Sequence, residues 1–278
     1  MPILQNRSIK WYLPLLLLIA GVIGSIYLHH LMRSLDQNAI EQGFRRSAQE
    51  RVAVFESEFA RPIDLIRAVH SLYSSSQSVD EREFVSFVNQ MKPHNVGFDA
   101  ITWVSYVDDS QRSDYERDES PTEPGRPIVQ RDDAGHLHPA SRRPQYFPVT
   151  YKYPANNPRV ELGEDLYFDP RFQDTFEIAK ASKHITASPA LASNDQAARF
   201  HVLLVSPVFH ALEDDSQATA PHQLKGFVVG RLRLDQVLEN ALEPLAPAGI
   251  KIQLFENTAP YDTRPAYHHH SRIAEQTL

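Results

Sequence analysis

The stretch from Arg142 to Leu166 carries residue types suited to holding a small molecule. It contains four tyrosine or phenylalanine rings and four prolines, and it ends on the carboxylate of Asp165. A carboxylate at the rim of an aromatic pocket forms one oriented, charge-assisted hydrogen bond, and the rings supply area for stacking. Asp165, with the rings of Phe147 and Tyr151 in the same stretch, is therefore a candidate for contact with a ligand.

Two other interpretations of this stretch stay open. Asp165 could cap a turn ahead of a helix, with the rings buried in a core. Alternatively, Arg142 and Arg143 could recognise a carboxylate on a ligand through their planar guanidinium groups. Residue types alone do not decide among the three.

Catalytic and cofactor-binding motifs are missing from the sequence. It has no glycine-rich dinucleotide fingerprint, no phosphate-binding loop, no zinc-protease motif and no serine-hydrolase elbow. The tandem histidines His268–His270 are more typical of a solvated tail than of a metal site, and no cysteine offers a thiolate ligand. We predict no catalytic residue, no metal site and no cofactor, so an enzyme activity is not expected within these residues.

An apolar segment near the start of the chain predicts a membrane anchor. Trp11–Leu28 is 18 residues long without a charge, which is about the length that crosses the hydrocarbon core. A cleaved signal peptide is the alternative, but no small-residue cleavage site follows. Arg7 and Lys10 precede the segment, so residues 1–10 are expected in the cytoplasm, 11–30 in the inner (plasma) membrane, and the rest in the periplasm or outside the cell.

The part of the chain beyond the anchor is acidic. It holds 26 basic and 35 acidic residues, a net charge of −9. Such a balance disfavours nucleic acid as a partner, because the phosphate backbone selects for lysine and arginine. The hydrophobic share of 42% is that of a folded globular protein.

Residues 31–94 are predicted to form stalk and linker helices. Apolar residues recur every three or four positions from Leu31 to Tyr73, as on one face of a long helix. This face could pack against the folded domain, or it could pair with a second copy in a homodimer. A capping box at Ser78-x-x-Glu81 predicts the start of a second helix.

The remainder predicts an α+β fold with mostly antiparallel strands. Strands rich in β-branched and aromatic residues are expected at 98–107, 198–209 and 226–234. Tyr146–Tyr153 reads as a strand in which Pro148 requires an edge position or a bulge. Asp169-Pro170 is a predicted helix start, with Asp169 as its cap.

Several short motifs, in the same order, resemble the signature of the CHASE domain, the extracytoplasmic sensor of many receptor histidine kinases and diguanylate cyclases. They are RPQYFPVTY at 143–151, LGEDL at 162–166, TASP at 186–189, LLVSPVF at 203–209 and KGFVVGRLRL at 225–234. The resemblance spans about Val69 to Leu254.

The resemblance implies two PAS-like α/β modules in tandem after the stalk. It places a membrane-distal, ligand-binding module at 95–210 and a membrane-proximal module at 211–278. Asp165 would match the aspartate that accepts hydrogen bonds from a purine-type ligand in plant receptors, with main-chain support at Thr186 and Ala187. The resemblance further implies that Phe147, Tyr151, Phe200 and Leu204 supply the apolar surface around this ligand. The chain would then be the sensory part of a receptor whose second membrane helix and transmitter lie beyond it, with a cytokinin-like or other small metabolite as ligand. The alternative is a membrane-tethered binding or scaffolding protein without a transmitter.

Overall fold

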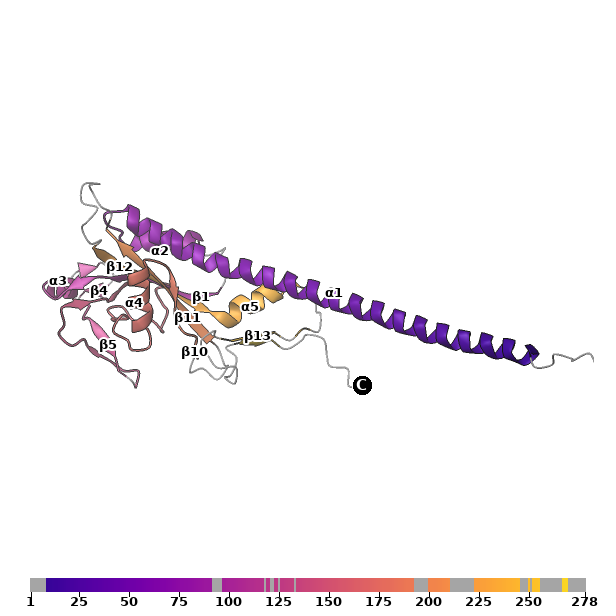
Figure 1. The fold of residues 1–278 in the computed structure, drawn as a ribbon. Coiled ribbons are helices and arrows are strands. Elements are labelled where there is room, and N and C mark those ends of the chain that lie inside the picture. The colour runs from indigo at the N-terminus through magenta and orange to yellow at the C-terminus, as the bar shows by residue number, and fades with distance from the viewer. Residues whose placement is uncertain are drawn as a thin grey trace, which may run out of the picture. The chain divides into compact units, whose positions relative to one another are not determined.

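The computed structural model divides the chain into two units, Met1–Ala53 and Val54–Leu278. It describes residues 9–91, 97–117, 119–120, 123–124, 126–132, 134–192, 200–210, 223–245, 250, 252–255 and 267–269. The helices are α1 (Ile9–Ser75), α2 (Glu81–Met91), α3 (Arg112–Arg117), α4 (Gln173–Ser182) and α5 (Leu234–Leu242) (Figure 1).

The first unit is the N-terminal part of α1. Its segment Leu15–Arg33 is long and apolar enough to cross a membrane, and all of its side chains are exposed. Exposed leucines and isoleucines are costly in water but not in a lipid bilayer. The predicted anchor therefore coincides with a helix of suitable length and composition. Further along this unit, Phe44 and Val52 are also exposed.

The second unit is built on one antiparallel sheet. Its strands follow the order β10 (Leu191–Ala192), β11 (Phe200–Phe209), β12 (Leu224–Arg233), β1 (Phe98–Ser105) and β8 (Val149–Tyr153), and β9 (Thr186–Ala187) also pairs with β11. Four two-stranded pairings lie outside it: β2 (Val107–Asp108) with β7 (Gln145–Tyr146), β3 (Glu119–Ser120) with β4 (Glu123–Pro124), β5 (Val129–Arg131) with β6 (Leu137–Pro139), and β13 (Ile252–Leu254) with β14 (Tyr267–His269).

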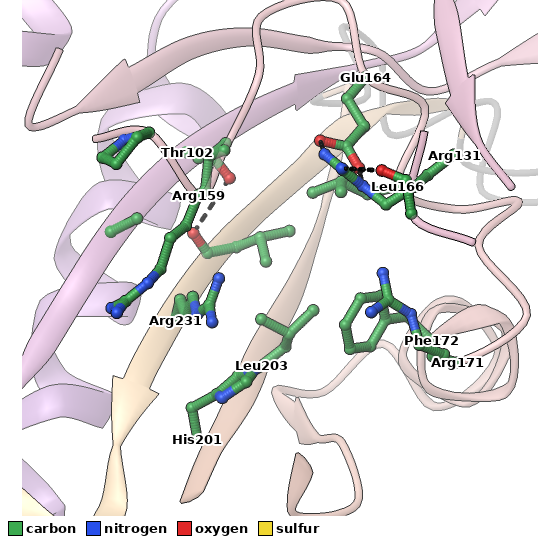
Figure 2. A pocket seen from close by; sticks show the side chains of 15 residues that line it. Thr102, Arg131, Arg159, Glu164, Leu166, Arg171, Phe172, His201, Leu203 and Arg231 are labelled. Carbon is green, nitrogen blue, oxygen red and sulfur yellow. Dashed lines mark hydrogen bonds and ion pairs between the residues drawn. The ribbon is translucent and has the colours of Figure 1, made fainter. Parts of the chain in front are cut away.

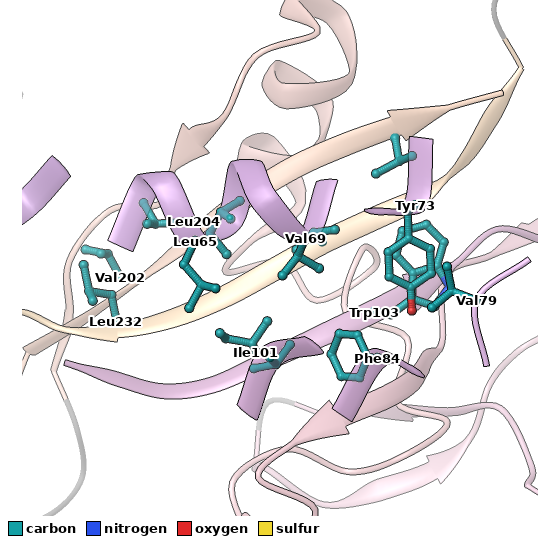
Figure 3. Close-up of a cluster of buried hydrophobic side chains, with 14 of the residues drawn as sticks. Leu65, Val69, Tyr73, Val79, Phe84, Ile101, Trp103, Val202, Leu204 and Leu232 are labelled. Carbon is teal, nitrogen blue, oxygen red and sulfur yellow. The ribbon is translucent and has the colours of Figure 1, made fainter. Parts of the chain in front are cut away.

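One face of the sheet is covered by the C-terminal part of α1 and by α2. Leu65, Ile66 and Val69 of α1 are fully buried against it, at the spacing of one helix face. The ring of Tyr73 stacks on Trp103 of β1, with 3.7 Å between centroids and 12° between planes (Figure 3). This end of α1 is therefore a structural part of the sheet domain.

The end of α1 is capped by the sheet. The ammonium group of Lys225 on β12 donates hydrogen bonds to the carbonyl oxygens of Tyr73 at 3.0 Å, Ser76 at 2.7 Å and Gln77 at 3.1 Å. Tyr73 belongs to the last turn of α1, whose carbonyls lack intrahelical partners, and Ser76 and Gln77 follow directly after the helix; a cation there also suits the helix dipole.

The capping box of α2 differs from the prediction. The main-chain N–H of Glu83 donates to Asp80 at 2.8 Å, and that of Asp80 donates to Glu83 at 3.1 Å. The predicted capping box of Ser78 and Glu81 is therefore wrong by two positions. Asp80 caps a helix at least as well as a serine, and it also has a glutamate, Glu83, three residues later.

The opposite face of the sheet carries a second core with α4. Phe147, Tyr167, Phe176 and Phe227 lie in ring contact there, with the first two stacked at 4.3 Å between centroids. Helix α4 begins at Gln173, later than the predicted Asp169-Pro170 start. Asp169 instead closes a turn, in which its side chain accepts from the main-chain N–H of Arg171 at 2.9 Å.

The predicted strand Tyr146–Tyr153 is interrupted at Pro148. Gln145–Tyr146 pairs with β2, and Val149–Tyr153 pairs with β1 as the last strand of the sheet. The segment 157–164 covers the outer edge of β8: the N–H of Val149 donates to Glu164 at 2.9 Å, and that of Gly163 donates to Val149 at 2.8 Å. The Lys152 ammonium group donates to the carbonyls of Asn157 and Val160. The expected edge position of this strand is thus confirmed.

The expected module boundary at 210/211 does not follow the sheet. Strand β12 lies between β11 and β1, so it belongs to the same sheet as residues 95–210. The physical reason is that β11 and β12 are paired along nearly their whole lengths, from His201 with Arg233 to Phe209 with Leu224. Most of 246–278 lies outside the described residues, so the tandem arrangement of two PAS-like modules remains a proposal.

Candidate functional site

A pocket of about 460 Å³ lies on the sheet face opposite α1 (Figure 2). Its floor is formed by alternate residues of the three central strands: Ala100 and Thr102 of β1, His201 and Leu203 of β11, and Val229 and Arg231 of β12. Successive residues of a strand point to opposite faces, so these neighbours share one side of the sheet. The walls include residues 158–160, Glu164, Leu166, residues 171–172 and Arg131 of β5. A cavity of this size suits a small metabolite.

Two arginines at the wall are each paired with a carboxylate of their own. Arg131 forms a two-pronged ion pair with Glu164, at 2.7 and 2.8 Å. Arg171 forms another with Asp169. Glu164 is nearly buried, so its ion pair fixes the wall in place.

Two further arginines share a single carboxylate. Asp99 Oδ2 lies 3.2 Å from Arg159 Nη1 and 3.4 Å from Arg231 Nε. The Nε of Arg231 is buried and makes no hydrogen bond to any residue that the structure describes. Burial lowers the pKa of Arg231, and Arg159 and Arg171 lower it further, against the opposing effect of Asp99.

His201 lies beside Arg231 at the pocket floor. Burial, and then the charge of Arg231, lowers the pKa of His201 to about 4. The imidazole is accordingly neutral near pH 7. Sequence reasoning missed both residues; the available signal was a histidine and an arginine on strands that are otherwise apolar, FHVLLVSPVF and LKGFVVGRLR.

Asp165, the predicted acceptor, is buried but is not among the residues that line this pocket. Its Oδ2 lies 3.1 Å from Arg143 Nη2, whose guanidinium stacks 4.0 Å over the ring of Phe168. Successive side chains of this extended segment point to opposite sides. Glu164 and Leu166 therefore line the pocket, whereas Asp165 between them does not. Burial raises the pKa of Asp165 to about 6 despite the attraction of Arg143.

The other predicted site residues lie on two faces of the sheet. Phe147 belongs to the core beside α4, whereas Tyr151, Phe200 and Leu204 pack on the α1 side. Thr186 and Ala187 form β9, and Ala187 and Leu204 line a second cavity, of about 590 Å³, between this strand region and α1. The structure therefore does not gather the predicted residues around one cavity.

The alternatives raised from the sequence can also be placed. Arg142 pairs with Asp109 at 3.0 Å and Arg143 pairs with Asp165, so each has an internal acid. Of the tandem histidines, His268 and His269 lie on β14, and their side chains are outside the described part of the chain. Among described residues there is no group of three or more potential metal ligands.

The described residues form a sheet with helices on one face and a pocket on the other, and an N-terminal helix segment long and apolar enough to cross a membrane. The family model of the CHASE domain matches residues 77–267. The chain belongs to this family of extracytoplasmic sensory domains, which confirms the resemblance seen in the sequence.

Known relatives agree with this assignment. Hybrid signal transduction histidine kinase A of Dictyostelium discoideum is 24% identical over 257 residues, which cover 84% of this chain and 11% of that protein. The chain thus spans about a tenth of that relative.

Similar solved structures are more distant. One is the ligand-binding domain of the Pseudomonas aeruginosa amino acid chemoreceptor PctC in complex with GABA, at 12% identity and a TM-score of 0.37, covering 72% of this chain and 63% of that one. Another is an extracellular ligand-binding receptor from Desulfohalobium retbaense, at 11% identity and a TM-score of 0.40, covering 71% of this chain and 27% of that one. Likeness at this level carries no argument about the ligand.

Proposed function

We propose that this chain is the sensory part of a transmembrane receptor, which binds a small molecule in the pocket on the sheet and passes the signal through α1 and the membrane to a cytoplasmic transmitter. The observation that carries the proposal is the two-sided use of β1 and β12. Thr102 and Arg231 line the pocket, while their chain neighbours Trp103 and Leu232 pack toward α1.

A ligand can act on α1 through this arrangement. A change in the position of the pocket floor has to be accommodated on the reverse face, where Trp103 stacks on Tyr73 of α1. Packed interfaces resist continuous deformation and shift between discrete arrangements. A ligand that favours one arrangement by about 1–3 kcal/mol would change the equilibrium constant between the arrangements roughly 5- to 150-fold.

The stalk supports a second part of the proposal, a homodimer. Phe44 and Val52 are exposed on the first unit. Large apolar side chains on an isolated helix are the kind of surface that a second copy buries in a coiled coil. Paired stalks would let two sensor domains act on one signalling unit.

The residues predicted from the family keep a place in this proposal. Asp165 could contact a ligand that enters from the side of Arg143, with Phe147 nearby, and Thr186 and Ala187 could do so from β9. Their distribution over the sheet instead favours the pocket at Arg231 as the principal site. A tethered binding protein with no transmitter is the second candidate, since a pocket and a membrane helix alone would suffice for it.

Ligand binding is tested with the full chain in lipid nanodiscs. A panel of neutral, cationic and anionic metabolites is screened by thermal shift against the wild type and against Leu203→Trp, which fills the pocket floor. Leu137→Trp, at an exposed position of β6, is the matched control. We expect at least one compound to stabilise the wild type and the control but not Leu203→Trp. If every stabilising compound also stabilises Leu203→Trp, the proposed site is wrong.

Signal transfer is tested by spin labelling, because the chain has no native cysteine to interfere. A label at Gln49→Cys, an exposed position on α1, reports the distance between two copies. A compound that binds the pocket is expected to shift the distance distribution. An unchanged distribution, with binding verified on the same sample, favours the tethered binding protein.

A further inference from the structure

We propose that the cavity between α1 and β11 is a second small-molecule site, which takes a neutral amphipathic molecule with an apolar body and one hydrogen-bonding group. This cavity is distinct from the pocket on the reverse face of the sheet, and the inference does not depend on a ligand in that pocket. Its polar contacts, His70 and Ser206, are not among the residues predicted from the sequence.

The shape and the apolar surface of the cavity are the first argument. Its volume is about 590 Å³, and its lining comes from α1, from β9 and β11, and from residues 183–185 after α4. The apolar part of the lining consists of Ile63, Ile185, Ala187 and Leu204. Figure 3 shows Leu204 among the side chains between α1 and the sheet. A cavity of this size and lining suits a small organic molecule with an apolar body.

A polar pair inside the apolar contact between α1 and β11 is the second argument. His70 Nδ1 on α1 lies 3.2 Å from Ser206 Oγ on β11, and both residues line the cavity. Ser206 is buried, and its hydroxyl makes no other hydrogen bond to a residue that the structure describes. A hydroxyl can donate one hydrogen bond and accept two, so that of Ser206 can serve a further partner. A ligand with one hydrogen-bonding group would supply that partner.

The neutral state of this polar pair sets the charge of the ligand. Burial lowers the pKa of His70, against the opposing effect of the Pro207 carbonyl, so the imidazole is uncharged near pH 7. The charged lining residues lie at the mouth of the cavity: the side chain of Arg67 is 68% exposed and pairs with Asp64 at 2.9 Å, and Lys183 is exposed. A charged group that reached Ser206 would lose its water without gaining a counter-charge from this pair, which is costly. The cavity therefore favours a neutral molecule.

The position of the cavity gives such a molecule a role. Adjacent residues of β11 line the two cavities, since Leu203 faces the pocket on the reverse side of the sheet and Leu204 faces this one. A molecule here would contact α1 at Ile63 and His70, and β11 at Leu204 and Ser206. It would therefore stabilise the packing of α1 on the sheet.

The experiment is disulfide capture at an introduced cysteine, which is specific because the chain has no native cysteine. The full chain in nanodiscs carries Ala187→Cys or His184→Cys, at exposed positions that line the cavity, or Ala181→Cys, at an exposed position of α4 that does not line it. The probes are mixed disulfides that carry a 4-hydroxyphenyl, a 4-methylphenyl or a 4-carboxyphenyl group on the same short linker. Intact mass measures the concentration of reductant at which half of the protein keeps the probe. Thermal unfolding without probe verifies that each variant is folded.

We expect the two cavity cysteines to keep the hydroxyphenyl probe at a reductant concentration at least tenfold higher than Ala181→Cys does. At the cavity positions the hydroxyphenyl probe should outlast the methylphenyl probe roughly two- to tenfold, the effect of one hydrogen bond, and it should also outlast the carboxyphenyl probe. Adding Ser206→Ala should remove the preference for hydroxyl over methyl. Ser71→Ala is the matched control, because the Ser71 hydroxyl also lines the cavity but donates to the Arg67 carbonyl at 2.9 Å, so the preference should remain. Hydrogen exchange of residues 63–71 should slow while the probe is held.

Four results would each overturn the inference. They are equal retention at the cavity and control positions, best retention of the carboxyphenyl probe, a hydroxyl preference that is absent or that survives Ser206→Ala, and unchanged hydrogen exchange of residues 63–71. The proposed function would survive all four if a metabolite still stabilised the wild type and not Leu203→Trp, because that variant fills the pocket on the other face of the sheet. It fails separately, when no compound shows that dependence on the pocket.

Discussion

Lys225 on β12 holds the carbonyl oxygen of Tyr73 at the end of α1, with its ammonium nitrogen 3.0 Å away. The contact joins a central strand of the sheet to the C-terminal end of α1. Six positions further along the same strand, Arg231 lies at the pocket. One strand therefore contacts both the pocket and the end of α1.

The first prediction concerns this cap. In Lys225→Met the carbonyls of Tyr73, Ser76 and Gln77 lose their donor, while the aliphatic part of the side chain is kept. We expect the free energy of unfolding to fall by about 1–3 kcal/mol, measured by chemical denaturation of the full chain. Lys180→Met on α4, whose ammonium group lies 5.8 Å from the Tyr167 ring, is the control. An equal loss in both variants would contradict a capping role.

A second prediction concerns the close approach of β12 to β1. Gly226 has φ +154°, and a Cβ there would lie 2.3 Å from the carbonyl oxygen of Val104 and 2.8 Å from the Trp103 ring. Gly226→Ala is expected to destabilise the domain by about 2–4 kcal/mol. Gly135→Ala, also at positive φ (+89°) but with nothing within 4 Å, isolates the backbone cost. Similar thermal shifts for the two would show that the contact itself matters little.

The third prediction is a pH dependence of stability from Asp165. The pKa of Asp165 is about 6 in the folded protein, compared with 3.8 for an aspartate without partners, which stands for the unfolded chain. Between about pH 4 and 6 the folded state therefore holds more protons than the unfolded state, and stability falls as pH rises through this window. The contribution is at most about 3 kcal/mol. Because His70 and His201 have lowered pKa values and act in the opposite sense, the test is the difference between the wild type and Asp165→Asn.

The same variant tests the ligand role of Asp165. If Asp165 holds the ligand, as the family resemblance implies, Asp165→Asn should weaken binding roughly ten- to a hundredfold. If it serves only to pair with Arg143, affinity should stay within about twofold. The measurement is calorimetric titration with a compound whose binding is lost in Leu203→Trp, at a pH where both proteins are folded.

The main strands and the two long helical segments could be predicted from the sequence because each has a periodic apolar pattern. The strands at Phe98, Phe200 and Leu224 follow from runs of β-branched and aromatic residues. The apolar segment before Arg33 is equally plain. Such signals depend on neighbours in the chain, so they do not require knowledge of the tertiary structure.

The candidate site could be predicted only in part, since its residues are brought together by register. Phe147 and Tyr151 lie on opposite faces because β8 is bulged where Val149 pairs with Val104 and Tyr151 with Trp103. One extra residue there turns the following side chains to the other face. Asp99 lies close to both Arg159 and Arg231, which follow it by 60 positions or more in the chain. A pattern in neighbouring residues cannot reveal contacts over such separations.

The segment that covers the outer edge of β8 also has a protective consequence. Residues 157–164 occupy backbone groups of β8 that would otherwise be open to a strand from another molecule. The same segment supplies Pro158, Arg159 and Val160 to the pocket. One loop therefore both covers the edge of the sheet and shapes the pocket, so a substitution that loosens it would expose unpaired backbone groups and change the pocket at the same time. If the pocket binds a ligand as proposed, a ligand that orders this loop would also protect the sheet edge from pairing with another molecule.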